Sequence, residues 1–148
     1  MSQDTLGTAR GLYDAFNRGD LIAFEKGCAP AFEWNEAESS LYSAGNPYRN
    51  FQEIVAGAFQ PTMRDFDNFR CEIERLIDAG DTIVGTGRYR GKHKRTGKNL
   101  SAQFCHVLHF DSAQKLDAVQ EYTDTLQEAE VAGRLQVVEE LRIPHPAL

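Results

Sequence analysis

Apolar side chains recur at helical spacing through most of the first sixty residues. The pattern predicts three helices, near 4–17, 20–27 and 50–59. Gly19 is placed to end the first helix and Asp20 to cap the second, while Pro61 is expected to close the third. A short strand is predicted at 32–36, followed by a loop with turn residues.

From about residue 69 the period changes to two, which is typical of strands. Strands are predicted near 69–77, 82–90, 99–110 and 116–125. Short polar turns, such as Asp78 to Asp81 and Asp111 to Lys115, join them as successive antiparallel hairpins. The expected fold class is α+β: a cone-shaped barrel in which three N-terminal helices cover the concave face of a curved, mainly antiparallel sheet.

If side chains alternate between the two faces without interruption from the turn at 111–115, the pairing of the last two strands is fixed. It pairs Phe110 with Leu116, Leu108 with Ala118, His106 with Gln120, Phe104 with Tyr122 and Ala102 with Asp124. The inner face then carries Phe104, His106, Leu108, Tyr122 and Asp124, and the outer face carries Cys105, Val107, His109, Val119, Glu121 and Thr123. An imidazole and a carboxylate on an otherwise apolar face predict a pocket, because burying them is costly without a partner or ligand.

The neighbouring strands extend this inner face. Gly85, Gly87 and Ala102 leave its middle hollow, and Arg75 shares the inward parity. Pairing through the turn at 78–81 sets Ile77 against Ile83 and Ile73 against Gly87. The hollow lies beside the predicted pocket.

The composition limits the classes of partner. The chain has 148 residues and a net charge of −6, which argues against nucleic acid as the main partner. The basic run from Arg88 to Lys98 is interpreted as a solvated hairpin tip. Neither a membrane span nor a signal-like N-terminus is found, so a cytoplasmic protein is expected. The scattered Cys28, Cys71 and Cys105 indicate reduced thiols.

Two segments are expected. Residues 1–126 form the α+β domain, and residues 127–148 form a C-terminal tail with a possible helix from Glu128 to Arg142. That helix would dock on the body or on a second subunit, or the tail would be free, and no chemistry is assigned to it.

Several segments resemble the nuclear transport factor two-like superfamily, and within it the SnoaL-like polyketide cyclase and ketosteroid-isomerase-like group. The resemblance is carried by YDAFNRGD at 13–20, EWNE at 33–36, DAGDTIVGTGRY at 78–89, TGK at 96–98, FCHVLHF at 104–110 and EYTDT at 121–125. It covers about residues 5–126 and implies the same cone. Because this fold hosts isomerases, hydrolases, cyclases, dehydratases and non-catalytic binders, it does not by itself define an activity.

The resemblance implies that His106 and Asp124 form an acid/base pair, with Trp34, Tyr48 and Tyr122 lining the cavity. Asp124 would be the general base, with His106 as its orienting partner or as the acid. Any of Tyr13, Tyr48 and Tyr122 could donate to an oxyanion. The further candidates for substrate contact are Glu36, Phe59, Phe104 and Arg75.

Each candidate also has a structural interpretation. Asp124 could cap the end of the last strand or pair with Arg75, and His106 could be a core histidine bonded to Gln120. Glu36 shares the face of Trp34 and could instead anchor a loop through a salt bridge. The tyrosines could simply be cavity wall.

Two functions remain open. The first is a small homodimeric enzyme that isomerises or cyclises a hydrophobic carbonyl compound by cofactor-free proton transfer. The second is a non-catalytic binding module for an apolar small ligand. Neither a cofactor nor a metal is expected. The homodimer is expected to form sheet on sheet, through an outer face centred on Val107 and Val119.

Overall fold

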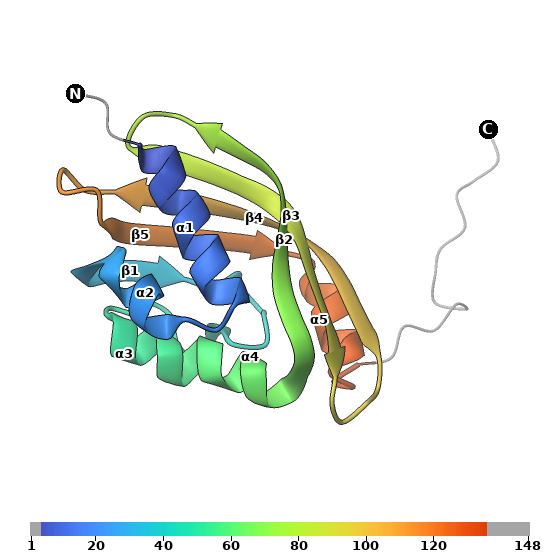
Figure 1. Ribbon diagram of the computed structural model, residues 1–148. Coiled ribbons are helices and arrows are strands. Elements are labelled where there is room, and N and C mark those ends of the chain that lie inside the picture. Colours follow the sequence, from blue (N-terminus) through green and yellow to red (C-terminus); the bar gives the residue numbers. More distant parts are fainter. Residues whose placement is uncertain (1–3, 136–148) are drawn as a thin grey trace, which may run out of the picture.

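The computed structural model describes residues 4–135 (Figure 1). Helical segments are α1 (Thr5–Asn17), α2 (Leu21–Lys26), α3 (Phe51–Ile54), a π-helical turn η2 (Val55–Phe59), α4 (Gln60–Asp65), α5 (Thr125–Val131) and the short 3₁₀ turn η1 (Ser43–Gly45). The strands are β1 (Cys28–Asn35), β2 (Phe66–Asp78), β3 (Thr82–His93), β4 (Asn99–Phe110) and β5 (Leu116–Thr123). All the predicted helices and strands are present, with small shifts at their ends.

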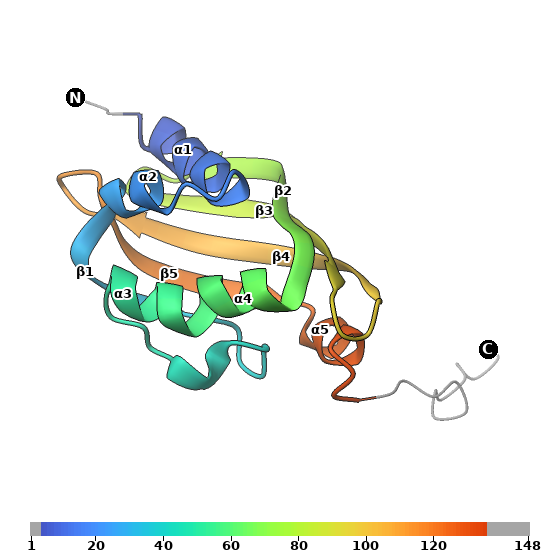
Figure 2. The ribbon, with the colours of Figure 1, turned by 60° about the horizontal axis from the view of Figure 1, so that its bottom comes forward.

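One sheet, in the order β1-β5-β4-β3-β2, forms the body of the protein. Strands β2 to β5 pair antiparallel through successive hairpins, while β1 pairs parallel with β5. In Figure 2, helices α1 and α2 lie at the top of the molecule, and α3 and α4 lie below them. The predicted α+β class with a mainly antiparallel sheet and covering N-terminal helices is confirmed.

The third predicted helix continues past Pro61 and ends at Asp65, so the expectation that Pro61 closes it is wrong. Proline cannot donate to the carbonyl four residues earlier, which here belongs to Gly57. The wider π turn precedes the proline, and the Gly57 oxygen lies 3.2 Å from the Tyr48 hydroxyl, whose single proton is shared with the Tyr42 oxygen at 2.6 Å. The helix therefore passes Pro61 with a widened turn and a side-chain hydroxyl beside the Gly57 carbonyl.

A β-bulge at Asp117 changes the face on which the following residues of β5 lie. Phe110 pairs with Leu116 as predicted, but His109 pairs with Ala118, so Asp117 is an extra residue. Its carboxylate lies 2.5 Å from Nδ1 of His109 on the outer side of the sheet. The residues of β5 after the bulge therefore face the side of the sheet opposite to the one that unbroken alternation predicts. His106 consequently pairs with Glu121 rather than with Gln120.

A second bulge, at Glu74, has the same effect in β2. Ile73 pairs with Gly87 as predicted, but Arg75 pairs with Thr86, and Ile83 pairs with Asp78 rather than with Ile77. Arg75 is exposed, so its predicted inward position is wrong. The hairpin at 94–97 predicts that Gly85 lies beside Phe104 and Gly87 beside Ala102. Strands β3 and β4 instead pair Gly85 with His106 and Gly87 with Phe104, and this shift of two residues preserves the face of every residue.

The start of the predicted tail belongs to the body of the protein. Helix α5 begins after Asp124, whose side chain caps it by accepting a hydrogen bond from the Gln127 N–H. It ends at Val131, and Gly133 follows with a φ of 72°, a conformation that suits glycine at a helix end. The predicted helix from Glu128 to Arg142 is thus shorter within the described residues, and 136–142 lies outside them.

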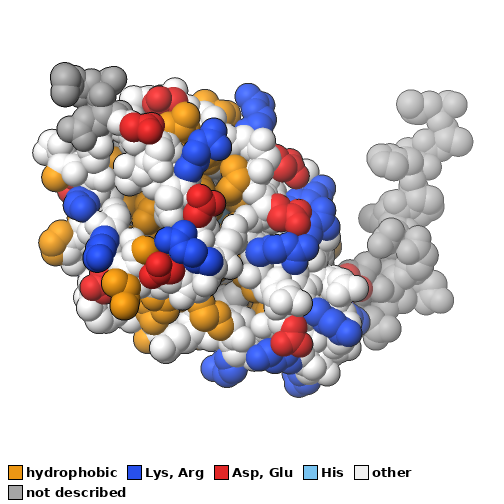
Figure 3. Space-filling model, in the orientation of Figure 1, with side chains coloured by type: hydrophobic (Ala, Val, Ile, Leu, Met, Phe, Trp, Pro, Cys, Tyr) orange, Lys and Arg blue, Asp and Glu red, His pale blue; other side chains and the backbone are white. Residues whose placement is uncertain are grey.

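The exposed surface mixes both signs of charge. Acidic and basic side chains alternate over the face shown in Figure 3. The basic run lies at the β3–β4 hairpin, where Arg90 Nε is 2.5 Å from a Glu72 oxygen. Within residues 4–135, no helix is long and apolar enough to cross a membrane. The homodimer remains a prediction, although Val119 is buried inside the cone and cannot belong to the outer face.

Candidate functional site

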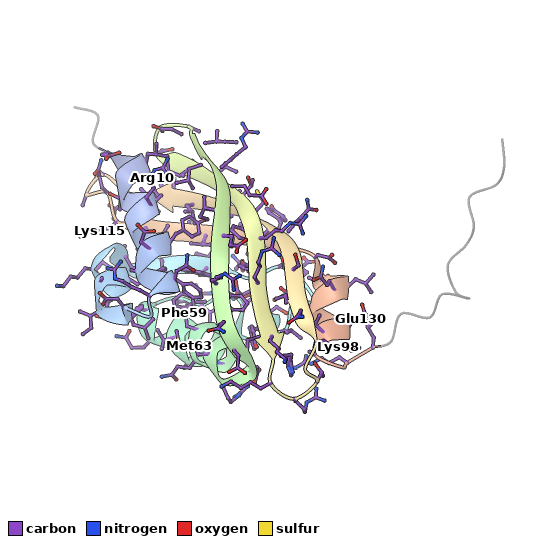
Figure 4. The ribbon with its side chains drawn as sticks, turned by 45° about the vertical axis from the view of Figure 1, so that its right-hand side comes forward. Arg10, Phe59, Met63, Lys98, Lys115 and Glu130 are labelled. Atoms are coloured by element: carbon purple, nitrogen blue, oxygen red, sulfur yellow. The ribbon has the colours of Figure 1, made fainter. Side chains whose placement is uncertain are left out.

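A cavity of about 90 Å³ lies between the helices and the concave face of the sheet. Its apolar part includes Phe24, Phe59 and Trp34, and the centroid of the Phe59 ring lies 5.2 Å from that of Phe24 and 5.5 Å from that of Trp34. Phe59 comes from the helical layer beneath α1 (Figure 4). The volume is enough for several waters or a small organic group.

A chain of four hydrogen-bonded side chains crosses one wall of this cavity. The Tyr13 hydroxyl lies 2.7 Å from Nδ1 of His106, and the Tyr89 hydroxyl lies 2.5 Å from Nε2. The Tyr89 O–H donates to Oε2 of Glu121. The four residues come from α1, β4, β3 and β5, so three adjacent strands and one helix hold the chain together.

These contacts define the tautomer of His106. Because Tyr89 donates its proton to Glu121, its oxygen accepts the Nε2–H of His106, and Nδ1 is left to accept the Tyr13 O–H. Burial lowers the pKa of His106 to about 3. The imidazole is therefore neutral near pH 7 and serves as a connector of hydrogen bonds.

Glu36 and Glu121 form a pair of carboxyl groups on the cavity. Burial raises the pKa of Glu36 well above its ordinary value, and the neighbouring Glu121 raises it further. Burial also raises the pKa of Glu121, but this carboxylate accepts hydrogen bonds from Tyr89 and from the Ala37 N–H at 3.1 Å. Glu36 accepts one from Trp34 Nε1 at 3.2 Å. Hydrogen bonds to the charged form thus favour Glu121 as the ionised member and Glu36 as the protonated one.

Glu128 brings a third carboxyl group to the cavity from α5. Its Oε2 accepts a hydrogen bond from the Leu41 N–H at 3.4 Å. Burial, with a smaller contribution from Glu121, raises the pKa of Glu128 to about 8. A segment for which the sequence indicated no chemistry therefore contributes an ionisable group to the site.

The structure places several predicted site residues as expected. His106, Trp34, Glu36, Tyr13 and Phe59 all line the cavity. Glu36 makes no salt bridge within residues 4–135, and the loop is anchored instead by Asn46, which bonds the Glu36 backbone at both N and O.

Two further candidates are buried but do not line the cavity. Phe104 stacks on His106 with ring centroids 4.4 Å apart and packs against the face of the imidazole. Tyr48 is buried beneath the loop, where its hydroxyl bonds the carbonyl oxygens of Tyr42 and Gly57.

Three predicted positions are wrong. Asp124 lies beyond the end of β5 and caps α5, and Tyr122 is 57% exposed. Both were placed on the inner face by unbroken alternation, which the bulge at Asp117 reverses. Arg75 is displaced outward by the bulge at Glu74. No contact between Asp124 and His106 is formed.

Sequence reasoning missed Glu121, Glu128 and the connecting role of Tyr89. A signal for Glu121 was available, because Leu116 and Val119 are apolar and three residues apart, with a strand-averse aspartate between them. A bulge at Asp117 reconciles that spacing with one buried face. For Glu128 no such signal exists, since glutamate on a short helix is typical of a solvated surface.

The fold and its enclosed cavity define a protein of the nuclear transport factor two-like (NTF2-like) class. Residues 9–118 match the model of the SnoaL-like domain, and the chain belongs to that family. Glu121 and Glu128 lie beyond the matched residues. The comparison with curated proteins finds no match.

Solved structures agree with this assignment. An NTF2-like protein from Burkholderia thailandensis is 32% identical, with a TM-score of 0.81, and the alignment covers 87% of this chain and 97% of that one. A protein from Shewanella denitrificans, described as a putative SnoaL-like polyketide cyclase, is 19% identical with a TM-score of 0.70, and the alignment covers 88% of this chain and 98% of that one. A protein with a ketosteroid isomerase-like fold from Catenulispora acidiphila is 14% identical with a TM-score of 0.70, and the alignment covers 85% of this chain and 92% of that one. The last two show the fold alone.

Proposed function

We propose that the protein catalyses cofactor-free proton transfer on a hydrophobic carbonyl compound, as an isomerase or an aldol-type cyclase. The observation that carries the proposal is the pair of carboxyl groups, Glu36 and Glu121, on one largely apolar cavity. Two neighbouring carboxyls whose environments differ supply an acid and a base at the same pH. Membership of a family that includes polyketide cyclases is consistent with this chemistry.

In the proposed reaction, Glu121 removes a proton from the carbon next to the substrate carbonyl. Glu36, which holds a proton, donates a hydrogen bond to the carbonyl oxygen as negative charge develops there. The resulting enolate either takes the proton back at another carbon, which gives isomerisation, or attacks a second carbonyl in the same molecule, which closes a ring and leaves an alkoxide that takes the proton from Glu121. In either case the protein ends with the protons it began with.

His106 has a positioning role in this scheme. A neutral imidazole with a pKa near 3 is a poor proton acceptor, but its Nε2–H holds the Tyr89 oxygen, and Tyr89 in turn holds Glu121. The role of general base assigned to Asp124 from sequence passes to Glu121, because Asp124 lies outside the cavity.

The test uses 2-tetralone, a bicyclic ketone with acidic protons beside its carbonyl, dissolved in D₂O. NMR measures the rate at which the protein replaces these protons with deuterium. We expect Glu121→Gln to lower that rate by a factor on the order of 100 to 10,000. Asp124→Asn is the matched control, since asparagine also caps helices, and should leave the rate unchanged.

The second function, a non-catalytic binding module, makes a different prediction for the same experiment. A binder would shift the NMR signals of the ketone without catalysing exchange, and Glu121→Gln would alter affinity alone. Catalysed exchange that survives Glu121→Gln would contradict the assignment of the base.

A further inference from the structure

Ser40 has an unsatisfied hydroxyl in the wall of the cavity. The residue is 9% exposed, and its Oγ has no hydrogen-bond partner among the described residues. It lines the cavity together with Glu128. A buried hydroxyl without a partner is costly, and such a group in a cavity wall is available to a bound molecule.

Glu128 is joined to the backbone beside Ser40. Its carboxyl accepts the N–H of Leu41, the residue that follows Ser40. Helix α5 therefore presents Glu128 to the same end of the cavity as Ser40. We call these two residues the Ser40–Glu128 subsite.

The electrostatics of the cavity are one-sided. Three carboxyl groups line it, from Glu36, Glu121 and Glu128, whereas neither lysine nor arginine does among residues 4–135. The remaining titratable groups on its wall are Tyr13, Tyr42, Tyr89, Cys71 and the neutral His106. No basic side chain thus compensates the carboxyl groups, and a ligand with a positive charge would do so.

We propose that the Ser40–Glu128 subsite binds the protonated amino group of a hydrophobic ligand. The Ser40 oxygen and the Glu128 carboxylate accept its N–H groups, and the ring of Trp34 lies on the same cavity, where aromatic faces attract cations. An anionic ligand would be repelled by Glu121, and by Glu128 once it is ionised. A metal ion is not favoured, because no group of three or more potential ligands within residues 4–135 has metal-binding geometry.

This inference deepens the proposed function and rests on it in one respect. If the cavity is the active site, the substrate carries both a carbonyl group and an amine. Binding of the amine is nevertheless independent of proton transfer, so each statement can fail without the other.

Cation binding is linked to the ionisation of Glu128. Its raised pKa, about 8, means that the group is mostly protonated at pH 6 and half ionised at pH 8. A bound ammonium group favours the ionised form, so affinity should rise with pH over this range, by at most about tenfold per pH unit. Glu36 and Glu121, which face the same space, would add to the effect in the same direction.

The experiment compares two probes of equal shape, benzylamine and benzyl alcohol, by isothermal titration calorimetry at pH 6, 7 and 8. Benzylamine should bind at least about tenfold more tightly, with the difference growing as the pH rises. Glu128→Gln should remove most of that preference, and Ser40→Ala should reduce it while the shape of the cavity is kept.

Glu130→Gln is the matched control, because Glu130 lies on the same helix but outside the cavity wall. It sits beside the hairpin that carries Lys98, whose Nζ is 3.5 Å from the Glu130 carbonyl oxygen (Figure 4). This variant should keep the full preference for benzylamine.

Equal binding of the two probes would overturn the proposal. So would the absence of benzylamine binding at millimolar concentration, or equal losses in Glu128→Gln and Glu130→Gln. If Glu128→Gln fails to fold, the preference of Ser40→Ala for benzylamine and the pH dependence of benzylamine binding to the wild-type protein still test the proposal. Deuterium exchange into 2-tetralone tests proton transfer separately.

Discussion

Gly85 leaves the space that the Tyr13 hydroxyl occupies. A Cβ atom at position 85 would lie 2.4 Å from the Tyr13 oxygen, which is closer than real Cβ contacts allow. The same hydroxyl reaches Nδ1 of His106 at 2.7 Å. The absence of a side chain at Gly85 therefore permits the Tyr13–His106 hydrogen bond, which begins the series of hydrogen-bonded side chains that ends at Glu121.

We expect Gly85→Ala to displace Tyr13 and to lower the free energy of unfolding by about 1 to 3 kcal/mol. Urea denaturation measures this cost. In a Tyr13→Phe background the clashing oxygen is gone, so the cost should be clearly smaller. Gly11→Ala on α1 is the control: its Cβ would meet nothing within 4 Å, and it should stabilise the protein by up to about 1 kcal/mol.

Asp124 should affect stability rather than chemistry. Its side chain caps α5, so Asp124→Ala should cost about 1 kcal/mol of unfolding free energy and Asp124→Asn much less. Thermal or urea unfolding of the two variants checks this. A loss of proton exchange in Asp124→Asn, with stability retained, would argue against the placement described above.

His106 should remain neutral over the whole physiological range. NMR of the imidazole nitrogens should show the Nε2–H tautomer and no titration between pH 5 and 8, because burial lowers its pKa to about 3. His109 provides an internal contrast, since Asp117 raises its pKa above the ordinary value. In the unfolded chain His106 takes up a proton near pH 6.5. The free energy of unfolding should therefore fall as the pH falls from 6.5 toward 3, because only the unfolded chain protonates this histidine.

Glu128 should have the opposite effect on stability. Its folded pKa of about 8 lies above the unfolded value of 4.5, so its contribution is present below pH 4.5 and is lost as the pH rises to 8. Glutamine does not ionise. The unfolding free energy of Glu128→Gln should hence rise relative to wild type by up to ~1.4 kcal/mol per pH unit between pH 5 and 8. Urea denaturation at several pH values tests this, and a constant difference would contradict it.

Ser40→Ala should stabilise the ligand-free protein. The substitution removes a buried hydroxyl that lacks a partner, and such a group costs about 1 to 3 kcal/mol. Thermal unfolding without ligand measures the gain, and Ser43→Ala serves as a comparison because the Ser43 hydroxyl bonds the Ser40 carbonyl at 3.0 Å. A destabilised Ser40→Ala would indicate that the hydroxyl is satisfied in solution.

The fold could be predicted from sequence because its signals are local. Helical spacing, capping residues such as Asp20 and short polar turns each act over a few residues, and here they agree with one another. The end of the third helix was mispredicted, since the hydroxyl beside the Gly57 carbonyl belongs to Tyr48, thirteen positions before Pro61. Interactions of that kind are absent from a local pattern.

The site was predictable as far as strand alternation was unbroken. His106 on β4 and Trp34 on β1 lie as expected, whereas residues beyond the bulges at Asp117 and Glu74 lie on the opposite face. Glu121 was assigned to the outer face for this reason. Glu128 could not be inferred at all, because the burial of its carboxyl depends on how α5 docks.

The extra residue at Asp117 means that β5 encodes two alternative cavity walls in one sequence. With Asp117 bulged out, Val119 and Glu121 face the ligand space. If Asp117 instead paired with His109 without a bulge, Ala118, Gln120 and Tyr122 would face it, whereas deletion of Asp117 would remove the bulge and keep Val119 and Glu121 inside. Loss of the bulge with Asp117 retained would thus exchange the reactive groups of the cavity, with the rest of the cone intact. Related proteins could diverge in chemistry by this route without any substitution at the site itself.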